Sequence, residues 1–314
     1  MKLFALKITL FALPFISIFV FFENKLGYLQ NTYAVKRDLI EARLDKIEIL
    51  ATGSSHSVAI NPRFFSRPGF NLANVSQDIF YDTQLINLYQ SQLKNLKLVI
   101  IPISYFSLEY QLDQSVEAWR MFFYNRFLGL PFETEPSLLE MRRYSLFAMY
   151  GINQSLQWAW QGAKIELAEP IDENGWQPQP NQTNKTQVIT DRQAKIRVAS
   201  HEALMNPAIL QTNMASISMT VEKLSRQNIQ VVFLTTPVFQ TYSDNIDSVK
   251  YNRMQGAIRQ LSDTYHIRYF NYLSDPRFAL EDFNDNDHLN AQGAEKFSRI
   301  IDREIIRMVL GSSF

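Results

Sequence analysis

The amino-acid sequence predicts an α/β fold in which a parallel sheet carries helices on both of its faces. Short apolar runs typical of buried strands alternate along the chain with segments long enough to be helices. Strands separated by helices of this length need right-handed crossovers, which make the strands parallel. Hydrophobic residues make up 46% of the 314 residues, which is ample for the core of such a fold.

An apolar segment at the N-terminus predicts a membrane anchor. The stretch from Leu3 to Phe22 is long enough to cross a bilayer as one helix, and its only polar residues are Lys7, Thr9 and Ser17. A secretory signal peptide is the alternative, but no small-x-small cleavage site follows. We therefore expect an uncleaved anchor over residues 1–23. The lysines near the amino terminus favour a cytoplasmic N-terminus and place the rest of the chain outside the cytoplasm.

A helical stalk is predicted next, over residues 24–45. Its apolar residues recur at helical spacing, and they are Leu26, Leu29, Tyr33, Ile40 and Leu44. Residues 46–314 are expected to form one domain that contains the sheet. Its predicted strands are 46–52, 69–73, 97–103, 229–236 and 266–272, and its predicted helices are 78–93, 208–226, 246–264 and 291–310.

The alternation of strands and helices is interrupted at about residues 105–207. The first part of this insertion is rich in aromatic residues. It predicts either a cap over a functional site or a helical subdomain that buries its own aromatic side chains. A polar, helix-breaking stretch at residues 174–181 predicts a surface loop.

The first of two informative motifs, Gly53-Ser54-Ser55-His56-Ser57, follows the first predicted strand directly. A Gly-Ser-Ser turn at this place lifts a serine hydroxyl onto the carboxyl edge of a parallel sheet. The backbone N–H groups of the next helical turn point at whatever binds there. Ligands of such sheets bind beyond this edge, so the position of Ser55 predicts a functional site.

The second motif, Asp285-Asn286-Asp287-His288, lies in a polar stretch near the end of the chain. A carboxylate three residues before a histidine can accept a hydrogen bond from one ring nitrogen. The other nitrogen of His288 is then free to take a proton. Together with Ser55, these residues supply the nucleophile, base and orienting acid that acyl transfer requires.

The two motifs and their order resemble the SGNH/GDSL hydrolase superfamily, over roughly residues 46–310. Ser54 replaces the family's aspartate, and this form looks like the membrane-anchored branch that includes DltD and the alginate O-acetylation proteins. The resemblance implies a three-layer α/β/α sandwich with a flavodoxin-like sheet. It also implies that Ser55 is the nucleophile and His288 the base, and it selects Asp285 over Asp282 and Asp287 as the acid.

Two further family blocks match less well. Ser76 stands near the glycine of the second block, so its backbone N–H is expected to form an oxyanion hole with that of Ser55. The third block should supply an asparagine after the strand at 97–103, but Ser104-Tyr105-Phe106-Ser107 contains none. Loss of one oxyanion donor costs about 10²–10³ in turnover. Either another group fills the role, or the site is weak, specialised for transfer or inactive.

The other histidines and motifs predict no second site. His56 is adjacent to Ser55, so its side chain should diverge from the hydroxyl and pack or line the substrate. His201 and His266 have no motif around them and are interpreted as structural. Asp282-x-Asn284-x-Asn286 imitates a calcium loop but lacks the required glycine and glutamate. We therefore expect neither a cofactor nor a metal.

Composition excludes other classes of protein. The formal net charge is zero and there is no long run of like charge, which argues against a nucleic-acid partner. The chain has no cysteine, which excludes disulfides, zinc-thiolate sites and a thiol nucleophile.

The function that these observations predict is O-acyl transfer, of acetyl or a similar group, to a cell-surface or exported polysaccharide through an acyl-Ser55 intermediate. The resemblance implies a multi-span membrane acyl donor as the partner. A deacylase with the same three residues is the first alternative. The second is a non-catalytic binding or assembly subunit, which the missing third-block asparagine favours.

Overall fold

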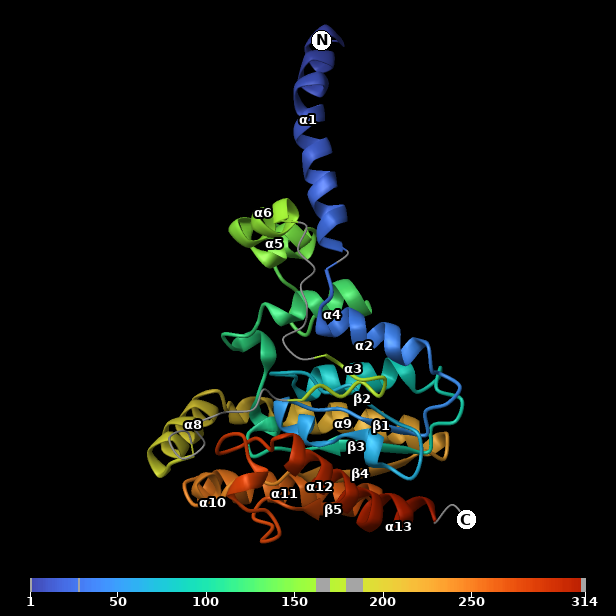
Figure 1. The fold of residues 1–314 in the computed structure, drawn as a ribbon, viewed down its shortest axis with the longest axis vertical. Helices are drawn as coiled ribbons and strands as arrows, with labels where there is room; N and C mark the ends of the chain where they lie inside the picture. Colours follow the sequence, from blue (N-terminus) through green and yellow to red (C-terminus); the bar gives the residue numbers. More distant parts are fainter. Residues whose placement is uncertain (1, 28, 162–169, 179–188, 312–314) are drawn as a thin grey trace. The chain divides into compact units, whose positions relative to one another are not determined.

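The computed structural model describes residues 2–27, 29–161, 170–178 and 189–311 (Figure 1). The chain divides into two compact units. The first comprises Met1–Ala34 and Trp119–Leu167, and the second comprises Val35–Ala118 and Ala168–Phe314. The central part of the predicted insertion thus belongs to the first unit and its two ends to the second. The stalk and the domain boundaries of the sequence analysis remain predictions.

The second unit is built around a five-stranded sheet in which all neighbouring strands are parallel. The strand order, β2-β1-β3-β4-β5, is that of flavodoxin-like folds. The predicted fold class is therefore confirmed. The strands are β1 (Ile49–Ala51), β2 (Gly69–Asn71), β3 (Leu98–Pro102), β4 (Gln230–Thr235) and β5 (Arg268–Asn271).

Helices cover both faces of the sheet (Figure 1). On one face α9 (Leu210–Arg226) packs between α3 (Ile79–Tyr89) and α11 (Ser248–Tyr265). The other face carries α12 (Ala291–Ile301). The remaining helices of this unit are α8 (Asp191–Ala203), α10 (Gln240–Ser243) and α13 (Arg307–Leu310), and α2 (Thr32–Glu41) crosses the boundary between the units.

The core between the sheet and α12 follows from the alternation of side chains along each strand. Alternate residues of the three central strands point toward the C-terminal helix, and six of them belong to one cluster of buried apolar side chains. The strands contribute Ile49, Ala51, Leu98, Ile100, Val232 and Leu234, and the C-terminal segment contributes Phe297, Ile301, Ile305 and Ile306. This cluster ties the last helix of the chain to the strand that precedes Ser55.

The predicted C-terminal helix, 291–310, is not one regular α-helix. It is interrupted by a π-helical turn, η8 (Asp302–Ile306), before α13 begins. Asp302 is buried, and one of its carboxylate oxygens accepts hydrogen bonds from the backbone N–H and the hydroxyl of Ser66, at 2.7 and 2.6 Å. The extra residue of a π turn lets the helix present this carboxylate inward while Ile305 and Ile306 stay in the core.

The predicted surface loop at residues 174–181 is wrong for Asn174 and Gly175, which are buried. The Asn71 N–H donates to the carbonyl of Asn174 at 2.9 Å, and the Trp176 indole donates to the carbonyl of Val58 at 2.8 Å. The segment therefore supplies an acceptor at the end of an edge strand. Residues 179–181 lie outside the described residues.

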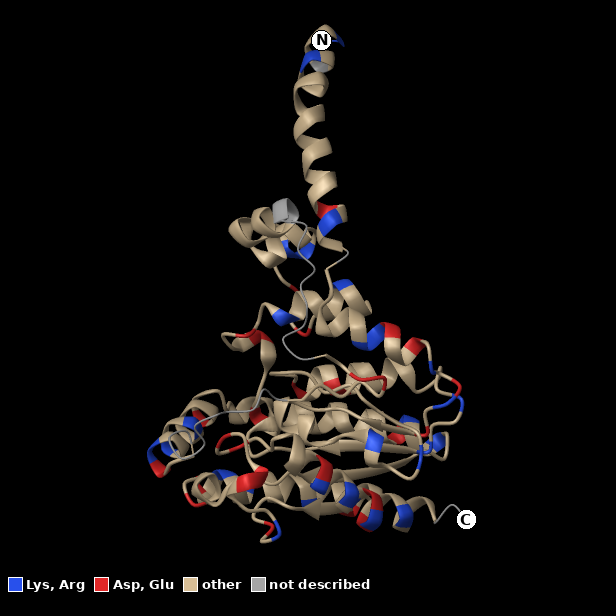
Figure 2. Cartoon of the chain, viewed as in Figure 1, with Lys and Arg blue, Asp and Glu red and all other residues tan. Residues whose placement is uncertain are grey.

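The first unit contains α1 (Lys2–Gly27), α4 (Arg120–Leu128), α5 (Leu146–Tyr150) and α6 (Ile152–Gln161). α1 is long and apolar enough to cross a membrane, and its apolar window is not buried. Figure 2 shows charged residues only toward its two ends. Near its C-terminal end, the Glu23 carboxylate accepts from the backbone N–H groups of Leu146 and Phe147, at 3.0 and 2.9 Å. Those are the first residues of α5, so Glu23 links the two helices.

Aromatic residues of the insertion are buried inside this first unit. The rings of Phe123 and Tyr124 lie 5.4 and 4.8 Å from the ring of Tyr33, measured between centroids. Phe122 is also buried. These side chains thus form part of the unit's own core, as the interpretation of a helical subdomain requires.

Substitution of Gly293 tests the close packing at the start of α12, and substitution of Gly256 is the control. A Cβ on Gly293 would lie 2.1 Å from the carbonyl oxygen of Asp282, whereas a Cβ on Gly256, inside α11, would meet nothing within 4 Å. Gly293→Ala should therefore lower the free energy of unfolding by about 1–3 kcal/mol. Gly256→Ala should raise it by about 1 kcal/mol. Urea midpoints of the two variants that move in the same direction would contradict this packing.

Candidate active site

The turn after β1 holds Ser55 at the carboxyl edge of the sheet. Gly53 adopts a φ of 115°, and a Cβ there would lie 2.1 Å from the Ser57 hydroxyl, so only glycine fits. The Gly53 N–H donates to a carboxylate oxygen of Asp82 at 2.7 Å. Ser55 is the first residue of a 3₁₀ turn, η1 (Ser55–Ala59), which Ser54 caps by accepting from the His56 N–H.

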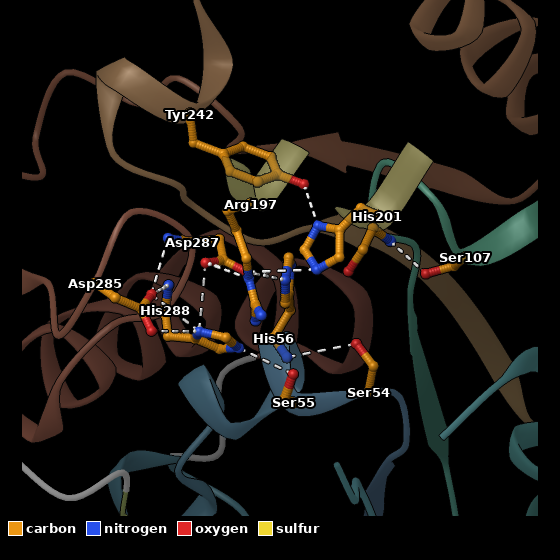
Figure 3. A network of polar contacts seen from close by, with 11 residues as sticks. Ser54, Ser55, His56, Ser107, Arg197, His201, Tyr242, Asp285, Asp287 and His288 are labelled. Carbon is orange, nitrogen blue, oxygen red and sulfur yellow. Dashed lines mark hydrogen bonds and ion pairs between the residues drawn. The ribbon is translucent and has the colours of Figure 1, made fainter. Parts of the chain in front are cut away.

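The structure brings Ser55, His288 and Asp285 together (Figure 3). His288 Nε2 lies 2.9 Å from Ser55 Oγ, and His288 Nδ1 lies 3.0 Å from both carboxylate oxygens of Asp285. With the proton on Nδ1, the ring donates to Asp285 and Nε2 can accept from the serine hydroxyl. This is the arrangement of nucleophile, base and orienting acid that the sequence predicts, and the catalytic roles themselves remain predictions.

A short loop holds the histidine in this position. Asp285 Oδ1 also accepts from the backbone N–H of His288 at 2.8 Å. The His288 carbonyl accepts from the Asn284 N–H at 2.8 Å. Two residues later, the Asn290 side chain caps α12 by accepting from the Gly293 N–H. The loop is thus fixed at both ends, and His288 is only 7% exposed.

A second carboxylate, that of Asp287, lies close to the His288 ring. Its side chain is 1% exposed, against 30% for Asp285, and one of its oxygens lies 3.6 Å from His288 Nδ1. His56 Nε2 lies 3.0 Å from Asp287 Oδ2. Arg197, on α8, donates from Nε to both Asp287 oxygens, at 2.8 and 3.0 Å.

Of the other three histidines, two extend this buried cluster and one lies apart from it. His56 is buried and turned away from Ser55 toward Asp287, as its neighbouring position in the sequence suggested. His201 Nδ1 lies 2.6 Å from the Tyr242 hydroxyl, and its ring packs on Phe106. His266 instead ends α11 in a left-handed conformation, which is a structural position.

The two carboxylates determine the charge of His288. Burial lowers the pKa of His288, but the charge of Asp287 and the hydrogen bond and charge of Asp285 outweigh it, so the pKa is raised. The pKa of His56 is lowered by burial, which outweighs its contact with Asp287. Burial would raise the pKa of Asp287, but the charge of His288 and the hydrogen bond from His56 hold it well below its usual range.

The predicted oxyanion donors lie in adjoining turns. The Asn74 N–H donates to the Gly53 carbonyl at 3.1 Å, so the loop that carries Ser76 is bonded to the turn that carries Ser55. Ser76 has a left-handed φ of 58°. Within the described residues, no acceptor is bonded to the backbone N–H of Ser55 or Ser76. In the segment after β3, where the third family block would place an asparagine, the Ser107 hydroxyl accepts from the Ser104 N–H at 2.9 Å.

One set of side chains in the described part of the chain is close enough to share a metal ion. It consists of His56, Asp287 and His288, whose ligand atoms lie within 4.8 Å of one another. Asp287 already accepts from His56 and from the Arg197 guanidinium, whose positive charge opposes a bound cation. The donor set therefore suits an ion pair better than a metal centre.

No family model and no curated protein matches the sequence. Among solved structures, an inferred acylhydrolase from Bacteroides fragilis is 12% identical, with a TM-score of 0.42, covering 89% of this chain and 99% of that chain. A GDSL-like lipase from Bacteroides thetaiotaomicron is also 12% identical, with a TM-score of 0.42, covering 88% of this chain and 100% of that chain. At this level of likeness neither structure identifies a family or an activity for this chain.

The raised pKa of His288 predicts a pH dependence. A histidine that acts as the general base, the role that the sequence predicts for His288, must be neutral, so the rate of ester hydrolysis should rise with pH through a midpoint above the usual pKa of histidine. Asp287→Asn should move that midpoint of kcat/KM to lower pH, because it removes the charge that favours the imidazolium. Asp191→Asn, an exposed carboxylate on α8, is the control and should leave the midpoint unchanged. A midpoint that does not move in Asp287→Asn would contradict the assigned electrostatics.

Asp82 predicts a second pH effect, on stability. Burial raises its pKa to about 7, although the hydrogen bonds from Gln77 and the Gly53 N–H oppose this. Between about pH 4 and 7 the folded state binds the proton more tightly than the unfolded state, so stability falls as pH rises. From pH 4 to pH 7, the wild type should therefore lose about 4 kcal/mol of unfolding free energy relative to Asp82→Asn. Urea titrations in which the difference in unfolding free energy between the two proteins does not change with pH would contradict this assignment.

Proposed function

We propose that this protein is a serine-dependent acyl-transfer enzyme in which Ser55 is the nucleophile, His288 the general base and Asp285 the orienting acid. The observation that carries the proposal is the continuous chain of hydrogen bonds from Ser55 Oγ through the imidazole to Asp285. This chain lies at the carboxyl edge of a parallel sheet, where ligands of such folds bind. The sequence resemblance to the SGNH/GDSL hydrolases supports the same assignment.

The proposed reaction has two displacements. His288 Nε2 takes the proton of the Ser55 hydroxyl while Oγ attacks the carbonyl carbon of an ester or thioester. The tetrahedral intermediate expels the leaving alkoxide or thiolate, which receives the proton from His288, and an acyl-serine remains. An acceptor hydroxyl then loses its proton to His288 and attacks the acyl carbon. The second tetrahedral intermediate expels Ser55 Oγ, which takes that proton back from His288. The N–H groups of Ser55 and Ser76 are the proposed donors to the oxyanion.

The proposed acceptor is a hydroxyl of a cell-surface or exported polysaccharide, and the proposed acyl group is acetyl or a similar one. The apolar helix α1 supports a membrane anchor. The lysines near the amino terminus support a location of the second unit outside the cytoplasm. The likeness of the Gly-Ser-Ser motif to membrane-anchored acylation proteins supports transfer over hydrolysis. A multi-span membrane protein is the proposed source of the acyl group.

Two alternatives use the same residues differently. A deacylase would pass the acyl group to water, and the same hydrogen-bonded chain supports it. A non-catalytic binding subunit is favoured by the absence of an asparagine side chain from residues 104–107. That absence removes one expected oxyanion donor and with it a factor of about 10²–10³ in rate.

Covalent labelling tests whether Ser55 is a live nucleophile. A pulse of 4-nitrophenyl acetate should leave a transient acetyl group on Ser55, detected by intact-protein mass spectrometry. Ser55→Ala and His288→Ala should lose the adduct, because the first lacks the nucleophile and the second lacks the base. Ser57→Ala, another buried hydroxyl of the same turn, is the control and should keep it.

The acceptor is tested in the same experiment. Decay of the adduct that speeds up with added oligosaccharide, and yields acetylated sugar, would support transfer. Decay that is insensitive to sugar would support the deacylase. Folded protein that reacts neither with this ester nor with a fluorophosphonate would support the binding subunit.

A further inference from the structure

Arg197 lies near the three proposed catalytic residues, and the mechanism proposed above gives it no role. It projects from α8, a helix that carries no recognisable motif. Its side chain is 42% exposed, while the carboxylate that it contacts, Asp287, is 1% exposed. The guanidinium therefore extends from a buried anchor toward a surface that a substrate can reach.

Contacts with the described residues occupy one edge of the guanidinium. Nε donates to both oxygens of Asp287, at 2.8 and 3.0 Å. Nη1 and Nη2 carry four more N–H groups, and none of them is bonded to an acceptor in the described residues. Figure 3 shows the end of the Arg197 side chain directed from Asp287 toward the side of the site where His288 and Ser55 lie.

Electrostatics place this charge near the same residues. The charge of Arg197 lowers the pKa of His288, in opposition to the two carboxylates. The charge of Asp285 in turn favours the charged form of Arg197. The Asp285 side chain is 30% exposed, and its carboxylate lies 3.0 Å from His288 Nδ1.

The buried cluster fixes the position of the guanidinium. Asp287 is held from one side by His56 Nε2 at 3.0 Å. The His56 ring packs edge to face on Phe106 and lies 5.6 Å from the ring of His201, which in turn contacts the Tyr242 hydroxyl. An arginine held in this way loses little freedom on binding a ligand, and its planar fork matches a carboxylate or phosphate.

We propose that Arg197 binds an anionic group, a carboxylate or a phosphate, on the substrate whose acyl group passes through Ser55, and so selects anionic substrates. The proposal rests on the proposed function, since it concerns the substrate of the same site. The anionic group is either on the acyl donor or on the hydroxyl acceptor. Arg197 is thus a specificity-determining residue, with Asp287 and His56 as the residues that position it.

Binding without turnover gives the first test. In the Ser55→Ala background, 4-nitrophenyl hydrogen succinate and 4-nitrophenyl acetate are titrated by calorimetry as an anionic and a neutral ester. We expect the anionic ester to bind more tightly, and Arg197→Gln to weaken only that ester, by about 10- to 100-fold. Arg197→Lys, which keeps the charge but not the fork, should give an intermediate value. Equal binding of both esters in every variant would exclude an anionic acyl donor. If glucuronate and glucose also bind equally in every variant, the proposal is overturned.

Turnover gives the second test and distinguishes donor from acceptor. With active protein, the ratio of kcat/KM for the succinate ester to that for the acetate ester should fall in Arg197→Gln, mainly through KM. If the anionic group belongs to the acceptor, this ratio stays constant, and glucuronate instead loses its advantage over glucose in discharging acetyl-Ser55. A fall of kcat for both esters to the same extent, with no change in either preference, would assign Arg197 a purely structural role.

The control variant is Lys195→Gln, which removes the same charge from an exposed position on the same helix and should change neither ratio. The outcomes for the two proposals differ. Failure of the proposed function appears as absence of any adduct on Ser55 in wild type. Failure of the Arg197 proposal appears as binding titrations in which neither the esters nor the sugars show a preference for the anionic member, and these titrations need no reaction.

Discussion

The packing of the C-terminal helix on the sheet is the constraint on which the site depends. Ser55 and His288 are 233 residues apart in the sequence, yet their side chains lie 2.9 Å apart. β1 ends just before Ser55, and α12 begins just after His288. Because Phe297 and Ile301 pack in the same apolar cluster as Ile49 and Ala51, the burial of that cluster also sets the distance between the Ser55 hydroxyl and His288 Nε2.

The second constraint is the compensation of a buried charge. Asp287 is almost wholly removed from water, and an unpaired carboxylate there would be very costly. The His56 hydrogen bond and the Arg197 guanidinium provide that compensation, and His288 adds its charge when protonated. The two carboxylates both stabilise the protonated form of His288. Asp285 in addition fixes the orientation of the ring through its hydrogen bond to Nδ1.

Much of the frame could be predicted from the sequence, because it is encoded locally. The apolar runs and the amphipathic helices of the second unit lie within a few residues of their predicted bounds, since strands and helices follow period and length. The meeting of Ser55 with His288 followed from two motifs and the geometry of parallel strands. The interruption at Asp302 was not predictable from period alone, because a π turn depends on the distant contact with Ser66.

Other parts of the site could not be predicted because their partners meet only through tertiary structure. Arg197 lies in the insertion, on a helix with no motif, and nothing local indicates that it contacts Asp287. Asp82 gave a weak signal, as a charged residue in an otherwise apolar helical turn, but its bond to Gly53 crosses from α3 to the nucleophile turn. The sequence resemblance selected Asp285 and set Asp287 aside, and thus gave the hydrogen-bond partner of His288 but not the more buried charge.

Arg197 and His288 share the Asp287 carboxylate, and this sharing couples substrate charge to the basicity of the site. The guanidinium lowers the pKa of His288, whereas Asp287 raises it. An anion bound to the free edge of Arg197 offsets part of the positive charge that His288 experiences, so the imidazole becomes a stronger base when such a substrate is present. By the reciprocity of linked equilibria, protonation of His288 strengthens anion binding by the same factor. In the proposed mechanism, the buried cluster therefore does more than hold a side chain in place, because recognition of a charged substrate and proton transfer from Ser55 depend on the same carboxylate.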